Sequence, residues 1–159
     1  MSKISPCLWF NGQAEEAARF YVSLLPDSRI DYVQKNVMDS GGGKEGSVLI
    51  VGFTLAGQTY QALNGNSNAP FTQAISLSVD CKDQAEVDRL WDALTAGGEG
   101  VACSWLKDRY GVSWQIVPSV MPKFLADPDR EKAGRVMKAM MSMVKLDIAA
   151  LQAAYDGHE

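Results

Sequence analysis

The sequence has 159 residues, of which 47% are hydrophobic and 21% are charged, as is ordinary for a soluble globular protein. Its formal net charge is -4, which argues against a nucleic-acid partner, because nucleic-acid binding needs clustered cationic side chains. No run approaches the roughly 18 apolar residues that a membrane span needs. The three cysteines, Cys7, Cys81 and Cys103, form no Cys-x-x-Cys pair, which favours reduced thiols in the cytoplasm.

The first half of the chain predicts one helix among several strands. Residues 4–10 form a short apolar strand, and residues 13–25 follow as a helix whose apolar residues recur at spacings of three and four. Three more strands are predicted, at residues 30–38, 47–55 and 59–63. The glycine-rich residues 39–46 are expected to be the most flexible segment.

The second half repeats this order and adds a helical tail. We predict a strand at residues 74–81, a helix at 84–96, and strands at 101–106 and 113–117 around a turn at 108–111. In the tail, Asp127 is the expected N-cap of a helix with Pro128 at its first position, and Asp147 is expected to cap a last helix.

Two local matches indicate that the halves are copies of one unit. Gln13-Ala-Glu15 opens the first helix and Gln84-Ala-Glu86 the second, while residues 57–63 and 111–117 share the order glycine, any residue, hydroxyl residue, aromatic, glutamine, any residue, aliphatic. Gln61 and Gln115 therefore occupy equivalent positions, on the strand face opposite Tyr60 and Trp114. We predict an α+β fold with modules at residues 3–66 and 72–118, followed by the tail at 119–157.

Alternation along the strands also predicts which side chains face a shared cleft. They are small polar groups beside aromatic and aliphatic ones, which suits a small, partly apolar organic ligand. The candidate ligand-binding residues are Trp9, Gln61, Leu63, Ser76, Ser78, Trp105, Ser113 and Gln115. Core packing of Trp9 and Trp105 is an equal alternative. Another is that the two glutamines hydrogen-bond across the cleft.

Four segments carry a resemblance to a known family: residues 6–21, 63–65, 84–91 and 105–118. On these segments, within a similarity running from about Ile4 to Leu151, the chain resembles the vicinal oxygen chelate superfamily of glyoxalase, bleomycin-resistance and extradiol dioxygenase proteins. It is most similar to the PhnB-like branch, often labelled 3-demethylubiquinone-9 3-methyltransferase-like. The resemblance implies two βαβββ modules whose mixed sheets curve around a shared cleft, and a homodimer.

The resemblance also implies where metal enzymes of the superfamily carry their ligands. Those positions fall at Gln61 and Gln115 and, to within about two residues, at Ser5 and Ala74. A divalent site needs about three ligands from His, Asp, Glu or Cys, and the only histidine, His158, lies beside the C-terminal end. No metal and no cofactor are therefore assigned, although weak ligation by glutamine oxygens stays open.

Catalytic motifs are absent from the sequence. Neither Gly41-Gly-Gly43 nor Gly97-Gly98 connects a strand to a following helix, as a methyl-donor site requires, so a methyltransferase function depends on the family label alone. Residues 107–109 are expected to be an exposed charged turn, with anion attraction as the alternative. We predict a cytoplasmic, dimeric protein that binds a small molecule. The alternative is an enzyme, either an atypical metal-dependent lyase or dioxygenase or the labelled methyltransferase.

Overall fold

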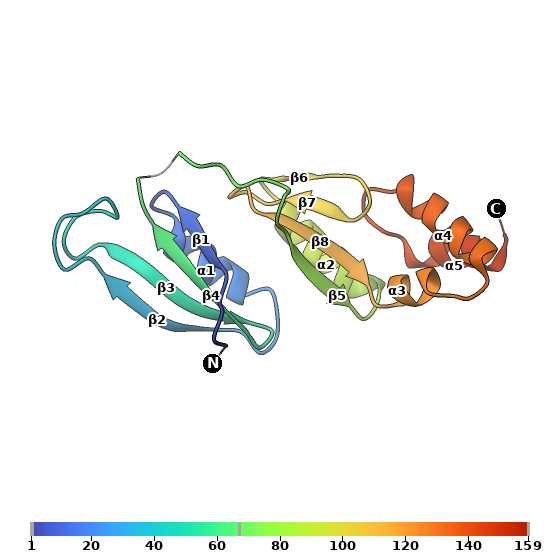
Figure 1. Cartoon of the computed structure of the whole chain (residues 1–159), viewed down its shortest axis with the longest axis horizontal. Helices are drawn as coiled ribbons and strands as arrows, with labels where there is room; N and C mark the ends of the chain where they lie inside the picture. Colours follow the sequence, from blue (N-terminus) through green and yellow to red (C-terminus); the bar gives the residue numbers. More distant parts are fainter. Residues whose placement is uncertain (1, 67, 159) are drawn as a thin grey trace. The chain divides into compact units, whose positions relative to one another are not determined.

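Two four-stranded mixed sheets, each with a helix on one face, form most of the computed structural model, which describes residues 2–66 and 68–158 (Figure 1). The chain divides into two units, Met1–Ala69 and Pro70–Glu159, and each is described by itself. The α+β class expected from the sequence is confirmed, and neither sheet closes on itself. No helix within the described residues combines the length and apolar character needed to cross a membrane.

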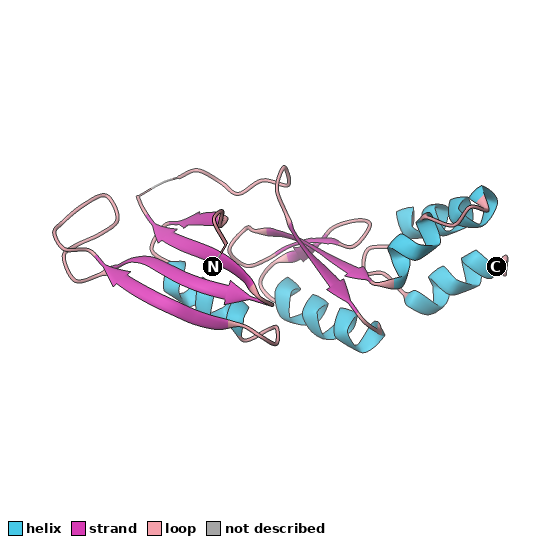
Figure 2. Cartoon of the chain, turned by 60° about the horizontal axis from the view of Figure 1, so that its bottom comes forward, coloured by secondary structure: helices cyan, strands magenta, loops and turns pink. Residues whose placement is uncertain are grey.

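The first unit follows the order strand, helix, three strands. Its elements are β1 (Cys7–Phe10), α1 (Ala14–Val22), β2 (Arg29–Lys35), β3 (Val48–Leu55) and β4 (Gln58–Asn64). The strands lie in the order β1-β4-β3-β2, with β1 parallel to β4 and the other pairs antiparallel. This crossover from β1 to the far edge leaves α1 lying along one face of the sheet (Figure 2).

The core of this unit lies between α1 and that face of the sheet. Small residues on α1 let the helix approach the strands closely, and the ring of Tyr21 lies 6.4 Å from that of Phe53. The buried apolar side chains are Leu8, Phe10, Ala14, Ala17, Ala18, Tyr21, Leu24, Val51, Phe53, Leu55 and Ala62. Alternation then sends the intervening strand residues to the opposite face of the sheet.

The segment between β2 and β3, expected to be flexible, has a defined hydrogen-bonded structure around Asn36. This side chain is only 4% exposed; its Nδ2 donates to the carbonyl oxygens of Gly42 and Ser47, and its Oδ1 accepts from the Ser40 hydroxyl at 2.7 Å. The backbone amide of Gly46 donates to the Asn36 carbonyl at 2.8 Å. One buried amide therefore satisfies much of the loop's backbone.

The second unit begins with the same plan. Its elements are β5 (Leu77–Cys81), α2 (Gln84–Thr95), β6 (Glu99–Gly100), β7 (Trp105–Lys107) and β8 (Ser113–Pro118), in the sheet order β5-β8-β7-β6 with β5 parallel to β8. The core is formed by α2 residues such as Leu90 and Leu94 and by sheet residues such as Trp114 and Ile116.

The strand expected at residues 101–106 is wrong in its first part. Residues 101–104 form a loop between β6 and β7, in which Cys103 and Ser104 have positive φ angles of 61° and 78°. Their backbone amides donate to the carbonyl oxygens of Met143 and Val144, both at 2.9 Å. Because these two amides are hydrogen-bonded to the tail, they cannot pair with a neighbouring strand, and the segment does not extend the sheet.

The tail forms α3 (Val120–Leu125), α4 (Arg130–Met141) and α5 (Ile148–Asp156), of which α3 was not predicted. Asp147 caps α5 as predicted, since its Oδ1 accepts from the amide of Ala150 at 3.0 Å. The predicted cap of α4 is wrong. Asp129, not Asp127, accepts from the amides of Glu131 and Lys132, because α4 begins after Pro128 rather than at it.

The tail packs onto the second sheet through its own apolar cluster. Met121, Phe124, Val136, Leu146 and Leu151 form the centre of this cluster, and Val117 of β8 packs against it. The tail therefore belongs to the same unit as the second sheet. On α4, Val136 is buried in this cluster, whereas Met137 and Met141 are exposed.

Candidate functional site

A row of paired residues crosses the first sheet on the face opposite α1. Cys7 pairs with Gln61, Gln61 with Gly52, and Gly52 with Tyr32, so the row runs over all four strands. Directly paired residues lie on the same face of a sheet. Since Leu8, Val51 and Ala62 point into the core, this row faces away from it.

A hydrogen bond spans the middle of this row above Gly52. The Gln61 Nε2 donates to the Tyr32 hydroxyl at 3.1 Å. A Cβ atom on Gly52 would lie 2.1 Å from Cε1 of Tyr32, so the ring crosses β3 where only a glycine allows it. Gly52 thus brings the phenol of β2 to the amide of β4.

This pair borders a hollow of about 490 Å³. Ser5, Arg29, Asp31 and Thr59 line it beside Tyr32 and Gln61. The Arg29 Nε lies 2.9 Å from the Asp31 Oδ1, and the Ser5 and Thr59 hydroxyls share a hydrogen bond of 2.6 Å. The positive charge of Arg29 and the negative charge of Asp31 cancel, so the lining has no net charge. The groups available to a ligand are therefore mainly hydroxyls and an amide.

Of the residues predicted from the sequence, Trp9, Gln61 and Leu63 share this face. Trp9 pairs with Leu63 in the row next to Gln61, and its indole is 47% exposed, with its Nε1 lying against Gly65. Cys7 also lies on this face, and burial raises the pKa of its thiol. A raised pKa keeps this thiol protonated and lowers its reactivity.

Sequence reasoning missed Tyr32, Arg29 and Asp31. The pairing of β2 with β3 shifts between Ile30 and Tyr32, so simple alternation along β2 fails at Asp31. The signal that could have found Tyr32 is Gly52, a lone glycine inside an otherwise apolar strand, which indicates close approach by another group.

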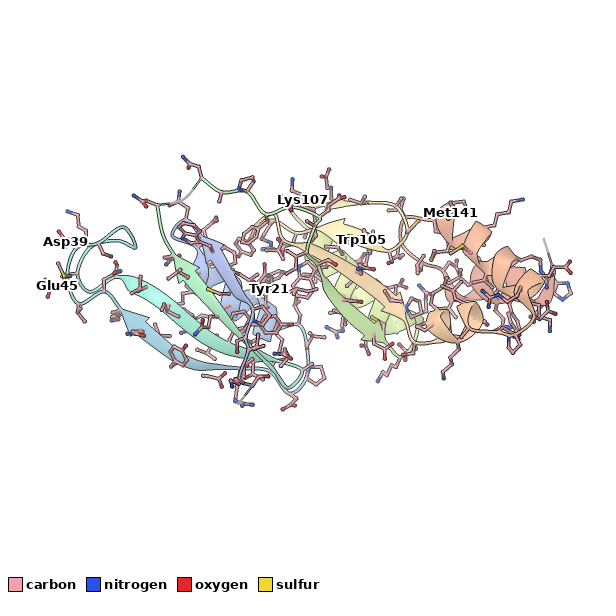
Figure 3. All side chains as sticks on the ribbon, in the orientation of Figure 1. Tyr21, Asp39, Glu45, Trp105, Lys107 and Met141 are labelled. Carbon is pink, nitrogen blue, oxygen red and sulfur yellow. The ribbon has the colours of Figure 1, made fainter. Side chains whose placement is uncertain are left out.

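The other five predicted residues lie together on the second sheet. Gln115 pairs with Ser78 on one side and with Trp105 on the other, and its Nε2 donates to the Ser76 hydroxyl at 3.0 Å. Ser113 lies two residues before Gln115 on the same face and is 3% exposed. Figure 3 shows Trp105 on β7 beside β8.

The register of the two sheets places Gln61 and Gln115 at equivalent positions. The residues that pair with them, Cys7 and Ser78, are 71 positions apart, the same separation as the matching segments Gln13-Ala-Glu15 and Gln84-Ala-Glu86. Ser5 then corresponds to Ser76, which lies within the two-residue margin of the expected position at Ala74. Ala74 itself lies in a turn before β5.

The exposed charged turn expected at residues 107–109 is wrong for Asp108 but not for its two neighbours. Asp108 is 2% exposed, and its carboxylate accepts from the backbone amides of Tyr110 and Val112 and from the Trp114 indole at 2.9 Å. This carboxylate is therefore occupied in holding the turn on β8. Lys107 and Arg109 on either side of it remain exposed.

The donor set does not fit the divalent metal that the fold family implies. The equivalent positions carry hydroxyls at Ser5 and Ser76 and amides at Gln61 and Gln115, whereas such sites use imidazole, carboxylate or thiolate ligands. Among residues 2–66 and 68–158, no group of three or more His, Cys, Asp or Glu side chains could hold a metal ion.

Comparison with known proteins decides the family. The model of the family described as 3-demethylubiquinone-9 3-methyltransferase matches residues 2–117. The chain belongs to this family. The match places this PhnB-like chain in the vicinal oxygen chelate superfamily, as the sequence suggested. The match ends within β8, short of the expected Leu151, so α3, α4 and α5 lie outside it.

Solved structures agree with this assignment. A PhnB protein of Bacillus cereus is 37% identical, with a TM-score of 0.67, and the alignment covers 74% of this chain and 99% of that one. A protein of Pseudomonas aeruginosa is 22% identical, with a TM-score of 0.59 and coverage of 74% and 98%. The fosfomycin resistance protein FosX of Listeria monocytogenes is 14% identical, with a TM-score of 0.51 and coverage of 79% and 96%. The last two show the fold alone. No curated protein matches the sequence.

Proposed function

We propose that this PhnB-like chain binds a small, partly apolar organic molecule on the sheet faces that carry the two glutamines. The observation that carries the proposal is the hollow where the Gln61 amide and the Tyr32 hydroxyl meet above Gly52. Because Tyr32 accepts from Gln61, its own proton can be donated to a ligand, and the Gln61 carbonyl can accept from one. Trp9 adds an exposed aromatic surface on the same face.

The groups on the second sheet support the same chemistry. Ser76 and Ser78 lie beside Gln115, and Trp105 is its neighbour on β7. These groups, like Gln61 and Tyr32 on the first sheet, are uncharged donors and acceptors next to an aromatic ring. Such a lining suits a molecule held by a few hydrogen bonds and apolar contacts rather than by charge.

The test is titration of the full chain with a panel of small aromatic carbonyl compounds, followed by backbone amide chemical shifts. We expect at least one compound to give saturable shifts at Tyr32, Gly52 and Gln61. Gln61→Ala should weaken its binding about tenfold, as expected for the loss of one good hydrogen bond. Gln58→Ala is the matched control, since Gln58 is exposed at the start of β4 and bonds only locally. Equal weakening by both substitutions, or shifts confined to other surfaces, would refute the proposal.

The family description names a methyltransferase, and this second candidate has its own test. Within the described residues, three connections lead from a strand to a helix, residues 11–13, 82–83 and 119. None of them is a glycine-rich turn of the kind that holds a methyl donor. Calorimetric titration with S-adenosylmethionine should therefore give no binding heat. A saturable heat would favour the methyltransferase.

A metal-dependent lyase or dioxygenase is the remaining alternative. The FosX structure is described as complexed with Mn(II) and a sulfate ion. Here the corresponding donors are amides and hydroxyls, so we expect purified protein to hold no stoichiometric divalent metal. Metal that is lost in the double variant Gln61→Ala with Gln115→Ala would overturn the binding proposal in favour of an enzyme.

We also propose that the protein works as a cytoplasmic homodimer. The dimer is inferred from the family resemblance. The cytoplasmic location is supported by its cysteines, since Cys7, Cys81 and Cys103 are all free thiols.

A further inference from the structure

A groove between α4 and α5 lies in the tail, outside the residues 2–117 that the family model matches. Its volume is about 740 Å³. The two helices run side by side in both views of the chain (Figures 1 and 2). The lining residues come from the second half of α4 and Ser142 after it, from α5, and from the two residues after α5. This groove is separate from the sheet faces of the proposed function.

The floor of the groove is apolar because small side chains face it. Ala139 of α4 and Ala150, Ala153 and Ala154 of α5 line it. The larger side chains of the same helices, including Val136 and Leu151, are fully buried in the tail cluster instead. Alanines cannot fill the space between two helices, so apolar surface stays accessible there. Met141, which is 65% exposed, adds a flexible apolar wall (Figure 3).

The rim of the groove carries two cationic side chains, Arg135 and Lys138, beside the imidazole of His158, and no carboxylate is among the described lining residues. Arg135 also lies 3.8 Å from the Glu131 carboxylate, so Lys138 is the main cationic group that a ligand can reach. The Arg135 guanidinium donates to the carbonyl oxygens of Ala154 at 2.8 Å and Tyr155 at 2.7 Å, so its charge offsets the carbonyl end of α5. Lys138 and His158 are exposed, and the backbone amide of His158 is fixed to the Ala153 carbonyl at 2.8 Å.

We propose that this groove binds a small amphipathic carboxylate, with its hydrocarbon chain on the alanine floor and its carboxylate at Lys138 and His158. The cationic rim differs from the rest of the chain, which has a net charge of -4, and from the hollow on the first sheet, where Asp31 balances Arg29. Burial of an alkyl chain stabilises binding by about 0.8 kcal/mol for each buried methylene, so an apolar floor favours a ligand with a tail over a simple anion.

The size of the groove favours a small molecule over a protein partner. Ligand sites typically enclose about 300–1,000 Å³, and this groove falls in that range. A stable protein interface needs roughly 20–30 residues from each side. The groove offers far fewer, all from two helices and their ends.

The test is titration of the full chain with sodium octanoate below its micelle concentration, followed by backbone amide chemical shifts. We expect saturable shifts at residues 138–142 and 150–158. Lys138→Glu should weaken octanoate binding at least about tenfold, because it replaces an attraction by a repulsion. Ala153→Leu should also weaken binding, because its side chain occupies the floor without changing the charge.

Two controls make the outcome decisive. Lys123→Glu makes the same charge change on an exposed lysine of α3 and should leave the affinity within about twofold. Octyltrimethylammonium carries the same chain with the opposite charge and should not bind. Equal binding of the two amphiphiles, equal effects of Lys123→Glu and Lys138→Glu, or shifts confined to residues outside 135–158 would each overturn the proposal. The proposal would also be overturned if a second copy of the chain occupied the groove. In that case the chemical shifts of the groove residues would depend on protein concentration in the absence of octanoate.

Discussion

At the scale of single residues, Cys81 shows how the fold controls a thiol. It ends β5, is fully buried and forms no disulfide. Burial raises the pKa of this thiol to about 12, and the negative charges of Glu86, Asp80 and Asp83 add to the effect against the opposing charge of Arg89. The thiol therefore stays protonated at neutral pH, when it is least reactive.

This shift predicts a loss of stability at alkaline pH. Between about pH 9 and pH 12 the unfolded thiol releases its proton while the folded one keeps it, so the free energy of unfolding falls as the pH rises. Below about pH 9 both forms are protonated, and Cys81 contributes no pH dependence. Urea unfolding midpoints measured at about pH 7.5, 9 and 10.5 should fall more steeply for the wild type than for Cys81→Ala. Cys103→Ala should keep the wild-type slope; identical slopes for all three proteins would contradict the prediction.

At the scale of elements, the turn between β7 and β8 depends on one carboxylate. The Oδ1 of Asp108 holds the backbone of Tyr110 and Val112, and its Oδ2 holds the Trp114 indole of β8. The turn therefore connects its own backbone to the core side of the sheet, and Gly111, at a φ of 92°, completes it.

Asp108→Asn tests this arrangement with almost no change in shape. Both carboxylate oxygens of Asp108 accept from N–H groups. In the asparagine variant the side-chain NH2 group would replace one of these oxygens, so one buried N–H donor would lose its acceptor. We expect the free energy of unfolding to fall by about 1–3 kcal/mol in urea denaturation. The control is Asp92→Asn, an exposed aspartate on α2 whose replacement should change stability by no more than about 0.5 kcal/mol. A similar small effect at both positions would show that Asp108 is not needed to hold the turn.

At the scale of the whole molecule, the tail is attached to the second sheet unit by polar contacts as well as by its apolar cluster. Gln84, at the start of α2, donates to the Leu146 carbonyl at 3.1 Å and accepts from the Ile148 amide at 2.8 Å. The loop at residues 101–104 donates to Met143 and Val144. The segment between α4 and α5 is thus bound from two elements of the unit.

Gln84→Ala should loosen the start of α5 in particular. Loss of two hydrogen bonds should lower the free energy of unfolding by about 1–2 kcal/mol, and hydrogen exchange at the Ile148 amide should become faster. Gln152→Ala is the matched control, because this exposed glutamine bonds only to Asp156 on its own helix. Unchanged exchange at Ile148 in the Gln84 variant would show that the apolar cluster alone holds the tail.

The strand–helix–strands plan of each half, without β6 and α3, and the equivalent positions of Gln61 and Gln115 could be predicted from the sequence. These features depend on the local spacing of apolar residues and on an internal repeat, and both can be recognised in the order of the residues alone. The cap at Asp147 could be predicted for the same reason, since its partner, Ala150, is three residues away. For the candidate site, alternation placed Trp9, Gln61 and Leu63 on one face, and Ser76, Ser78, Trp105, Ser113 and Gln115 on another.

Only the tertiary structure decided which distant groups meet. Tyr32 reaches Gln61 because β2 shifts its register at Asp31 and because Gly52 lies between them. The buried Asp108 carboxylate accepts from the turn amides of Tyr110 and Val112 and from Trp114 on β8. The amides of Cys103 and Ser104 donate to the tail instead of to the sheet. In each case the outcome depends on hydrogen-bond partners brought together by packing, which composition and periodicity do not encode. The sequence by itself indicated two similar strand–helix–strands segments and the equivalent positions of Gln61 and Gln115. The packing of the chain decided which side chains surround each glutamine.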